Sequence, residues 1–236
     1  MTARRAINGR MGVGELRSEV ISRGIGGCAK MHPMPKGIYH HLDDHSGELT
    51  AIEAFSCAPG PQGWRYVADV TDPDGAQLGR VDLTVDAQWR PVRVEVKSGG
   101  WVVKAGAVGG RIIYVRLPEG EVAPAGEQAT EAAAVTGRSP AFAIATSKLL
   151  QLQENDKRRI KLLAITEPSA GVQITDQGWA LTASETHEAE TEPLVVRRYE
   201  VADLATGERA AWSIAGDVVL EGPHLELIEL ESPPNQ

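Results

Sequence analysis

The sequence contains few cysteines and no long hydrophobic run, and each shortage excludes a class of protein. Its 236 residues include two cysteines, Cys28 and Cys57, too few for a disulfide framework or a cysteine-based metal cluster. No run of 18 apolar residues occurs, so no transmembrane helix is predicted. The Arg-rich N-terminus lacks the apolar core of a secretory signal. We therefore expect a reduced, cytoplasmic protein.

Basic residues are also fewer than acidic ones. Lys and Arg number 24 against 32 Asp and Glu, which gives a net charge of −8. A nucleic-acid partner is not expected, because contacts to phosphates require a basic face. Residues 1–30 nevertheless carry six of the basic residues and only two acidic ones. We interpret residues 1–36 as a disordered leader or as the result of a start codon assigned too early, and a transit peptide is a further alternative.

Alternation of apolar and polar residues is the most extensive pattern after residue 37. In "WRYVADVT" (64–71) the residues Trp64, Tyr66, Ala68 and Val70 share one face. The same alternation directs Val81, Leu83 and Val85 inward, and likewise Val92, Val94 and Val96. Short turns such as "DPDG" (72–75) separate these runs. Alternation with a period of two residues and tight turns predicts antiparallel strands with one solvated face.

The pattern changes in the middle of the chain. Residues 117–138 are rich in Ala, Glu, Gly and Pro and have no apolar stripe, which predicts a mobile loop or lid. In "SPAFAIATSKLLQLQ" (139–153) Ser139 is suited to a helix N-cap and Pro140 to the first helical position. Phe142, Ala145, Leu149 and Leu152 share one face, so we expect one short amphipathic helix. Strand-like runs then continue to the C-terminus.

The predicted fold class is mainly β: a single antiparallel β-barrel or β-roll of about ten strands over residues 37–232, with one helix. Such a sheet must cover its edges, and closing into a barrel is the usual solution. The segments "RYVADVTDPDG" (65–75) and "RYEVADLATG" (198–207) resemble each other. A fold made of two similar β-meanders would explain this similarity. Any series of β-hairpins could also produce it, because strands and turns use similar residues.

Residues 37–48, "GIYHHLDDHSGE", contain the densest group of reactive side chains. His40 and His41 are adjacent, so on a strand they point to opposite faces. The closely spaced ligand motifs of known metal sites are absent. We therefore predict no metal and no cofactor. The composition fits a strand, a turn and a second strand. One histidine of this hairpin, on the inner face, could supply a hydrogen bond or a proton to a bound molecule.

Other candidate residues lie on predicted strands. Aromatic side chains with a polar atom suit a cavity that is apolar but offers hydrogen bonds. The candidates for binding are Trp64, Tyr66, Trp101, Tyr114, Trp179, Tyr199 and Trp212, and the alternative is that each is a core or sheet-surface residue. Alternation predicts that most of the strand carboxylates, Glu53, Asp69, Glu95, Glu185 and Glu200, face solvent. No G-x-S-x-G motif is present, so nucleophilic hydrolysis is not predicted.

The order of several segments resembles a bacterial family of glycolipid-binding proteins that adopt a spiral β-roll. The segments are "YVADV" with "VDLTVDAQWRPVRVEV", "IIYVR", "SPAFAIATSKLL" before "RIKLLAIT", and "RRYEV", within roughly residues 60–220. The architecture is also similar to bacterial lipoprotein-carrier half-barrels and, more loosely, to small β-barrel cyclases that fold linear polyketides. These resemblances imply a cavity for an extended, largely apolar molecule, and we carry over no functional residue from them.

Two functions are therefore expected as alternatives. The first is binding of an extended, largely apolar small molecule, lipid-like or polyketide-like, inside the barrel. The second is a cyclase or isomerase that holds a linear polyketide-like substrate in a reactive fold, since positioning alone lowers reaction barriers. The candidates for a catalytic role are His41, Tyr66 and Tyr199. A homodimer is left open.

Overall fold

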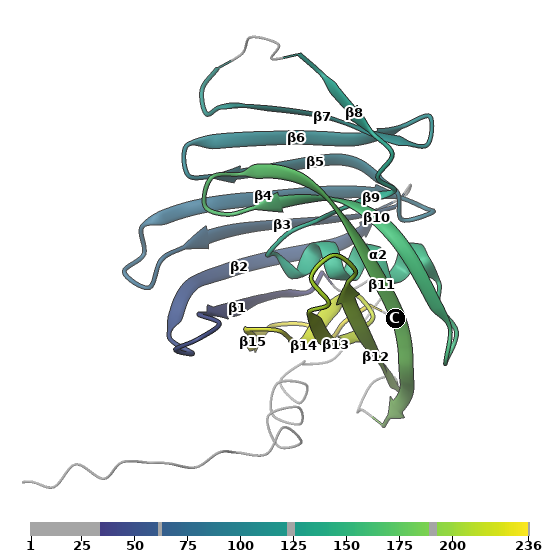
Figure 1. Ribbon diagram of the computed structural model, residues 1–236. Helices are drawn as coiled ribbons and strands as arrows, with labels where there is room; N and C mark the ends of the chain where they lie inside the picture. The colour runs from purple at the N-terminus through teal and green to yellow at the C-terminus, as the bar shows by residue number, and fades with distance from the viewer. Residues whose placement is uncertain (1–33, 61–62, 122–125, 189–192, 236) are drawn as a thin grey trace, which may run out of the picture.

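The computed structural model describes residues 34–60, 63–121, 126–188 and 193–235, and the predicted leader, except Met34 to Lys36, lies outside them together with Cys28. The described residues form one sheet and one helix (Figure 1). The first half of the chain contains β1 (Lys36–Leu42), β2 (Leu49–Gly60), β3 (Gly63–Thr71), β4 (Gln77–Asp86), β5 (Pro91–Ser98), β6 (Trp101–Val108), β7 (Arg111–Pro118), β8 (Gln128–Thr130) and β9 (Ala134–Thr136). The second half contains α2 (Pro140–Leu150), β10 (Lys157–Thr166), β11 (Gly171–His187), β12 (Leu194–Asp203), β13 (Arg209–Ala215), β14 (Val218–Gly222) and β15 (Leu225–Leu230).

The sheet has fifteen strands in the order β8-β7-β6-β5-β4-β3-β2-β1-β15-β14-β13-β12-β11-β10-β9. The first and last strands, β1 and β15, pair with each other in its middle, with Gly37 opposite Leu230. All neighbours are antiparallel except β9 and β10, which are parallel. The prediction of a mainly β fold is confirmed. The sheet has more strands than the expected ten or so, and its end strands β8 and β9 do not pair with each other.

Burial of the apolar residues on β3, β4 and β5 follows the predicted alternation with one exception. Trp64, Tyr66, Ala68 and Val70 are all buried on β3. Val94 and Val96 are buried on β5, but Val92 is 58% exposed, so its predicted inward position is wrong. The register between β4 and β5 shifts next to Val85, which pairs with Pro91. Such an irregularity changes the face to which the following residue points.

The segment 117–138 contains more regular structure than a loop. Residues 122–125 lie outside the described residues, and the strands β8 and β9 follow them. Ala132, Ala134 and Val135 are buried, and the backbone N–H of Ala133 donates to the carbonyl of Lys161 on β10 at 2.8 Å. The second half of this segment is therefore attached to the sheet and carries the chain from one end strand to the other.

The helix forms where it was predicted, but it is not amphipathic. Ser139 is its N-cap, with extended backbone and with its Oγ accepting from the backbone N–H of Ala141. Every residue from Pro140 to Ser147 is buried, because the sheet curls around the helix (Figure 1). A helix that is buried on all sides belongs inside a core, and the small Ala141, Ala143 and Ala145 allow close packing. The helix packs against β9 and β14.

Aromatic side chains fill much of the remaining interior. The rings of Tyr39 and Phe55 stack at 4.8 Å, and those of Phe55 and Tyr66 at 5.4 Å. Trp64 packs against Tyr66 and also against Trp89. The interior beside these strands is consequently a packed core. Among the described residues, no helix has the length and the hydrophobicity needed to cross a bilayer.

Candidate functional site

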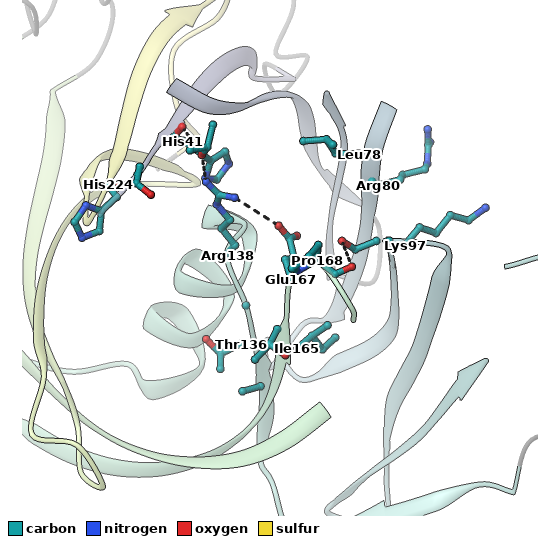
Figure 2. A pocket seen from close by; sticks show the side chains of 18 of the residues that line it. His41, Leu78, Arg80, Lys97, Thr136, Arg138, Ile165, Glu167, Pro168 and His224 are labelled. Carbon is teal, nitrogen blue, oxygen red and sulfur yellow. Dashed lines mark hydrogen bonds and ion pairs between the residues drawn. The ribbon is translucent and has the colours of Figure 1, made fainter. Parts of the chain in front are cut away.

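A cavity of about 1340 Å³ lies at one rim of the curled sheet (Figure 2). Strand ends and turns from both halves of the chain form its wall, so segments far apart in sequence meet there. Its apolar surface includes Leu42, Leu78, Ile165, Pro168 and Trp212. Its polar and charged wall includes His41, Asp43, Asp44, His45, Thr50, Asp69, Arg80, Lys97, Glu119, Arg138, Glu167 and His224.

Directly behind His41 lies a network of hydrogen bonds centred on the Glu53 carboxylate. Glu53 is 1% exposed and His41 is 3% exposed. The Oε2 atom of Glu53 lies 2.8 Å from Nε2 of His41, and its Oε1 atom accepts from the Tyr66 hydroxyl at 2.8 Å and the Ser139 hydroxyl at 2.6 Å. Three strands and the N-cap of α2 therefore converge on one carboxylate.

The local sequence explains why His41 faces inward. On β1 the buried residues alternate as Gly37, Tyr39 and His41, while His40 lies on the other face and is half-buried. The predicted separation of the two histidines is confirmed. The following turn is held by Asp43, whose Oδ1 accepts from the backbone N–H groups of His45 and Ser46. These bonds, that of Ser46 first, lower the pKa of Asp43, as expected for an aspartate that holds a turn.

Arg138 and Glu167 place opposite charges on the cavity wall beside His41. The Arg138 guanidinium donates to Oγ1 of Thr50, and that hydroxyl donates to the carbonyl oxygen of His41 at 2.9 Å. Arg138 also lies 4.0 Å from the Glu167 carboxylate (Figure 2). Burial raises the pKa of Glu167, and the nearby Arg138 only partly opposes that shift. The site thus combines a buried histidine, a cation and a carboxyl group with a weakened tendency to ionise.

The turn between β10 and β11 carries Glu167 and is held from the other half of the sheet. Arg116 on β7 donates to the carbonyl oxygens of Ser169 at 2.8 Å and Ala170 at 2.9 Å. The guanidinium of Arg116 also lies 3.5 Å from the ring centre of Trp101, a cation–π contact. Ser98 donates to the carbonyl oxygen of Pro168 at 3.1 Å. These contacts fix one wall of the cavity.

The aromatic residues predicted to bind a ligand are distributed over the core and the rim. Trp212 lines the cavity. Trp101 and Tyr114 are half-buried and pack against the core. Four others are almost fully buried: Trp64, Tyr66, Trp179 and Tyr199.

The structure brings together two of the three candidates for a catalytic role. His41 and Tyr66 both contact Glu53. Burial, followed by the charge of Glu53, raises the pKa of Tyr66 far above 10, so its hydroxyl acts as a donor. Tyr199 packs edge-on against Trp179 instead, and burial raises its pKa too.

Sequence reasoning missed Glu53, Arg138 and Glu167. The expectation that Glu53 faces solvent is wrong, because it shares a face of β2 with the buried residues Ala51, Phe55 and Cys57. Alternation along β2 could therefore have predicted that Glu53 is buried. Arg138 and Glu167 carried no signal, because each lies outside a regular element. Within the described ranges, no three His, Cys, Asp or Glu side chains are grouped to hold a metal.

Comparison with known proteins gave no family model that matches the chain, and no curated protein matches it. Among solved structures, the chain is similar to a DUF1089 family protein from Pseudomonas aeruginosa, with a TM-score of 0.45, 16% identity, and coverage of 86% of this chain and 97% of the other. It is also similar to a β-barrel-like protein of domain of unknown function DUF1849 from Brucella abortus, with a TM-score of 0.43, 12% identity, and coverage of 85% and 98%. Neither similarity bears on function.

Proposed function

We propose that the protein binds an extended, largely apolar small molecule, lipid-like or polyketide-like, in the rim cavity. The observation that carries the proposal is the pairing of apolar wall residues with an oriented buried histidine in one cavity. Ligand sites are typically mostly apolar with a few placed polar groups. Leu78, Ile165 and Trp212 would contact the apolar part of the molecule, and His41 and Arg138 would contact an oxygen-bearing group.

Two matched leucines allow a direct test. Leu78 is 44% exposed and lines the cavity, whereas Leu204 is 48% exposed and does not belong to its wall. A fluorescent fatty-acid analogue titrated into the wild type should give saturable binding. Leu78→Glu should weaken that binding about tenfold, because a charge would have to lose water against an apolar ligand, and Leu204→Glu should leave it unchanged. Equal effects of both substitutions, or no saturable binding, would contradict the proposal.

A second candidate uses the same cavity. A cyclase or isomerase would hold a linear polyketide-like substrate there and act mainly by positioning. The observation that favours it is the contact between His41 and Glu53, since a base must be held in a fixed orientation to transfer a proton. Mass spectrometry and chromatography of the molecule that co-purifies with the protein, before and after incubation, separate the two. A product with a changed ring count supports the enzyme, and an unchanged molecule supports binding alone.

A further inference from the structure

The hydrogen bonds around Glu53 determine which nitrogen of His41 carries the proton. The hydroxyls of Tyr66 and Ser139 both bond to Oε1, and each can donate. An ionised carboxylate only accepts hydrogen bonds, and three converging partners suit that form. With Glu53 ionised, the third partner, Nε2 of His41, bears the hydrogen and donates it to Oε2 at 2.8 Å. A neutral His41 therefore has Nδ1 as its unprotonated nitrogen.

Nδ1 of His41 is open to the cavity. It makes no hydrogen bond to any residue in the described part of the chain, and His41 lines the cavity wall. In that same part, the one fully buried polar side-chain atom without a partner is Oδ1 of Asn235. Nδ1 is therefore not sealed in the core but can be reached from the cavity. It presents a hydrogen-bond acceptor at a position where Glu53 fixes the ring from behind.

We propose that the molecule bound in the rim cavity carries an acidic hydroxyl group, such as an enol, a phenol or a carboxylic acid, and gives its proton to Nδ1 of His41. This inference rests on the proposed function and names the chemical class of its ligand. The O–H bond of the ligand breaks and an N–H bond forms at Nδ1. The products are a ligand anion and an imidazolium whose other N–H stays bonded to Glu53, so no further reactant is needed.

The charges around His41 favour this transfer. The Glu53 carboxylate stabilises the imidazolium from inside the core, as a carboxylate does beside a catalytic histidine. Arg138 is linked to the His41 backbone through Thr50 and offers its guanidinium to the new anion. Glu167 is the opposing carboxyl group, and burial raises its pKa, which favours its uncharged form. The hydroxyl of Tyr66 faces Glu53, and Asp43, Asp44, His45 and His224 lie further along the wall.

An alkyl-substituted 4-nitrophenol is a suitable probe, because its visible absorption reports its ionisation, and its methyl ether is a matched control without the acidic proton. With wild-type protein we expect the phenol to bind as the phenolate at a pH where the free probe is mostly protonated. Its apparent pKa should fall by about one unit, a tenfold preference for the anion. The methyl ether has no acidic proton, so its binding should show no preference for an anion.

Glu53→Gln is the most informative substitution, because glutamine has nearly the same shape as glutamate. Its carbonyl oxygen can still accept from Tyr66 and Ser139, but its amide N–H would donate to Nε2 of His41. The proton of a neutral His41 would then move to Nδ1, which would face the cavity as a donor. We expect this variant still to bind the methyl ether but to lose the ionisation of the phenol. Should it not fold, His41→Gln must show the same loss.

Nitrogen-15 NMR of the ligand-free protein tests the proton position independently of binding. The spectrum should show His41 protonated on Nε2 in the wild type and on Nδ1 in Glu53→Gln. Wild-type protonation on Nδ1, or equal ionisation of the phenol by the wild type and both variants, would overturn the inference. If the methyl ether binds and the phenol stays protonated, this inference alone fails. If neither probe binds, the proposed function fails as well.

Discussion

Glu167 shows how one side chain at the rim balances burial against charge. Its side chain is 23% exposed and lies 4.0 Å from Arg138. Burial raises its pKa and outweighs the attraction of Arg138, and the charge of Glu53 raises it further. A carboxyl group with a raised pKa in the folded state binds its proton more tightly there than in the unfolded chain. Its ionisation therefore costs stability.

Replacing Glu167 by Gln should raise the free energy of unfolding at pH 7. The stability linked to Glu167 is fully present below the unfolded pKa of 4.5 and is lost as the pH rises through the higher folded pKa. The advantage of Glu167→Gln should therefore be largest at neutral pH and shrink on acidification. Urea unfolding of both proteins between pH 7 and pH 4 measures this difference.

Asp176 provides a control of opposite sign. Hydrogen bonds from Arg159, at 3.0 Å and 2.6 Å, lower the pKa of Asp176. Asp176→Asn should therefore lower stability at pH 7, and this loss should largely persist down to pH 4, because the folded pKa lies below the ordinary value of 3.8. If Glu167→Gln lowered stability at pH 7 while Asp176→Asn behaved as stated, the interpretation of Glu167 would be wrong.

Individual residues of the site were predictable where strand parity determines burial. The separation of His40 from His41 followed from alternation alone, and the same rule, applied to Glu53 with Phe55 and Cys57, identifies a buried carboxylate. Parity failed for Val92, which lies at the shift in register between β4 and β5. The hydrogen bond between Ser139 and Glu53 joins residues 86 positions apart, a distance at which no local pattern operates.

At the scale of elements, the turn between β5 and β6 supports the turn between β10 and β11. Gly99 and Gly100 both have positive φ, +56° and +77°. A Cβ atom on Gly99 would lie 2.0 Å from the carbonyl oxygen of Pro168, whereas nothing lies within 4 Å of one on Gly100. Gly99 thus permits a close approach between the backbones of the two turns. Gly100 makes no such approach.

These two glycines form a matched pair for mutation. Gly100→Ala should cost about 1 kcal/mol, the usual strain of a left-handed alanine. Gly99→Ala adds a backbone collision to the same strain, and we expect a loss of about 2–4 kcal/mol. Thermal or urea unfolding measures both values. Equal losses would show that the contact between the two turns does not contribute to stability.

Most elements were predictable because each has a local signature. The strands β3, β4 and β5 follow the alternating runs, and the helix follows its Ser-Pro start. The strand-like runs "GVQIT" (171–175) and "GWALTASET" (178–186) lie in one continuous strand, β11. The strands β8 and β9 have three residues each, too few for a period to be recognised.

At the scale of the whole molecule, the pairing of β1 with β15 is the decisive feature. It places the first and last strands in the middle of the sheet and leaves β8 and β9 at its ends. Alternation predicts which face of a strand is buried but not which strand lies beside it. For the same reason the sequence predicted a barrel-like sheet but not its strand order, nor a helix enclosed by it.

This arrangement makes the location of the proposed ligand the central question. The core contains α2 and stacked aromatic rings, whereas the cavity opens at the rim. A molecule at the rim should perturb Leu78 and Ile165, which line the cavity. A molecule in the interior should instead perturb Ile112 and Ile144, both fully buried.

Methyl NMR of protein labelled at Ile and Leu, titrated with the methyl ether of the alkyl nitrophenol, is therefore the most direct test. We predict saturable shifts of the methyl signals of Leu78 and Ile165 and unchanged signals of Ile112 and Ile144. Shifts confined to Ile112 and Ile144, or no saturable shift at Leu78 and Ile165, would contradict binding in the rim cavity.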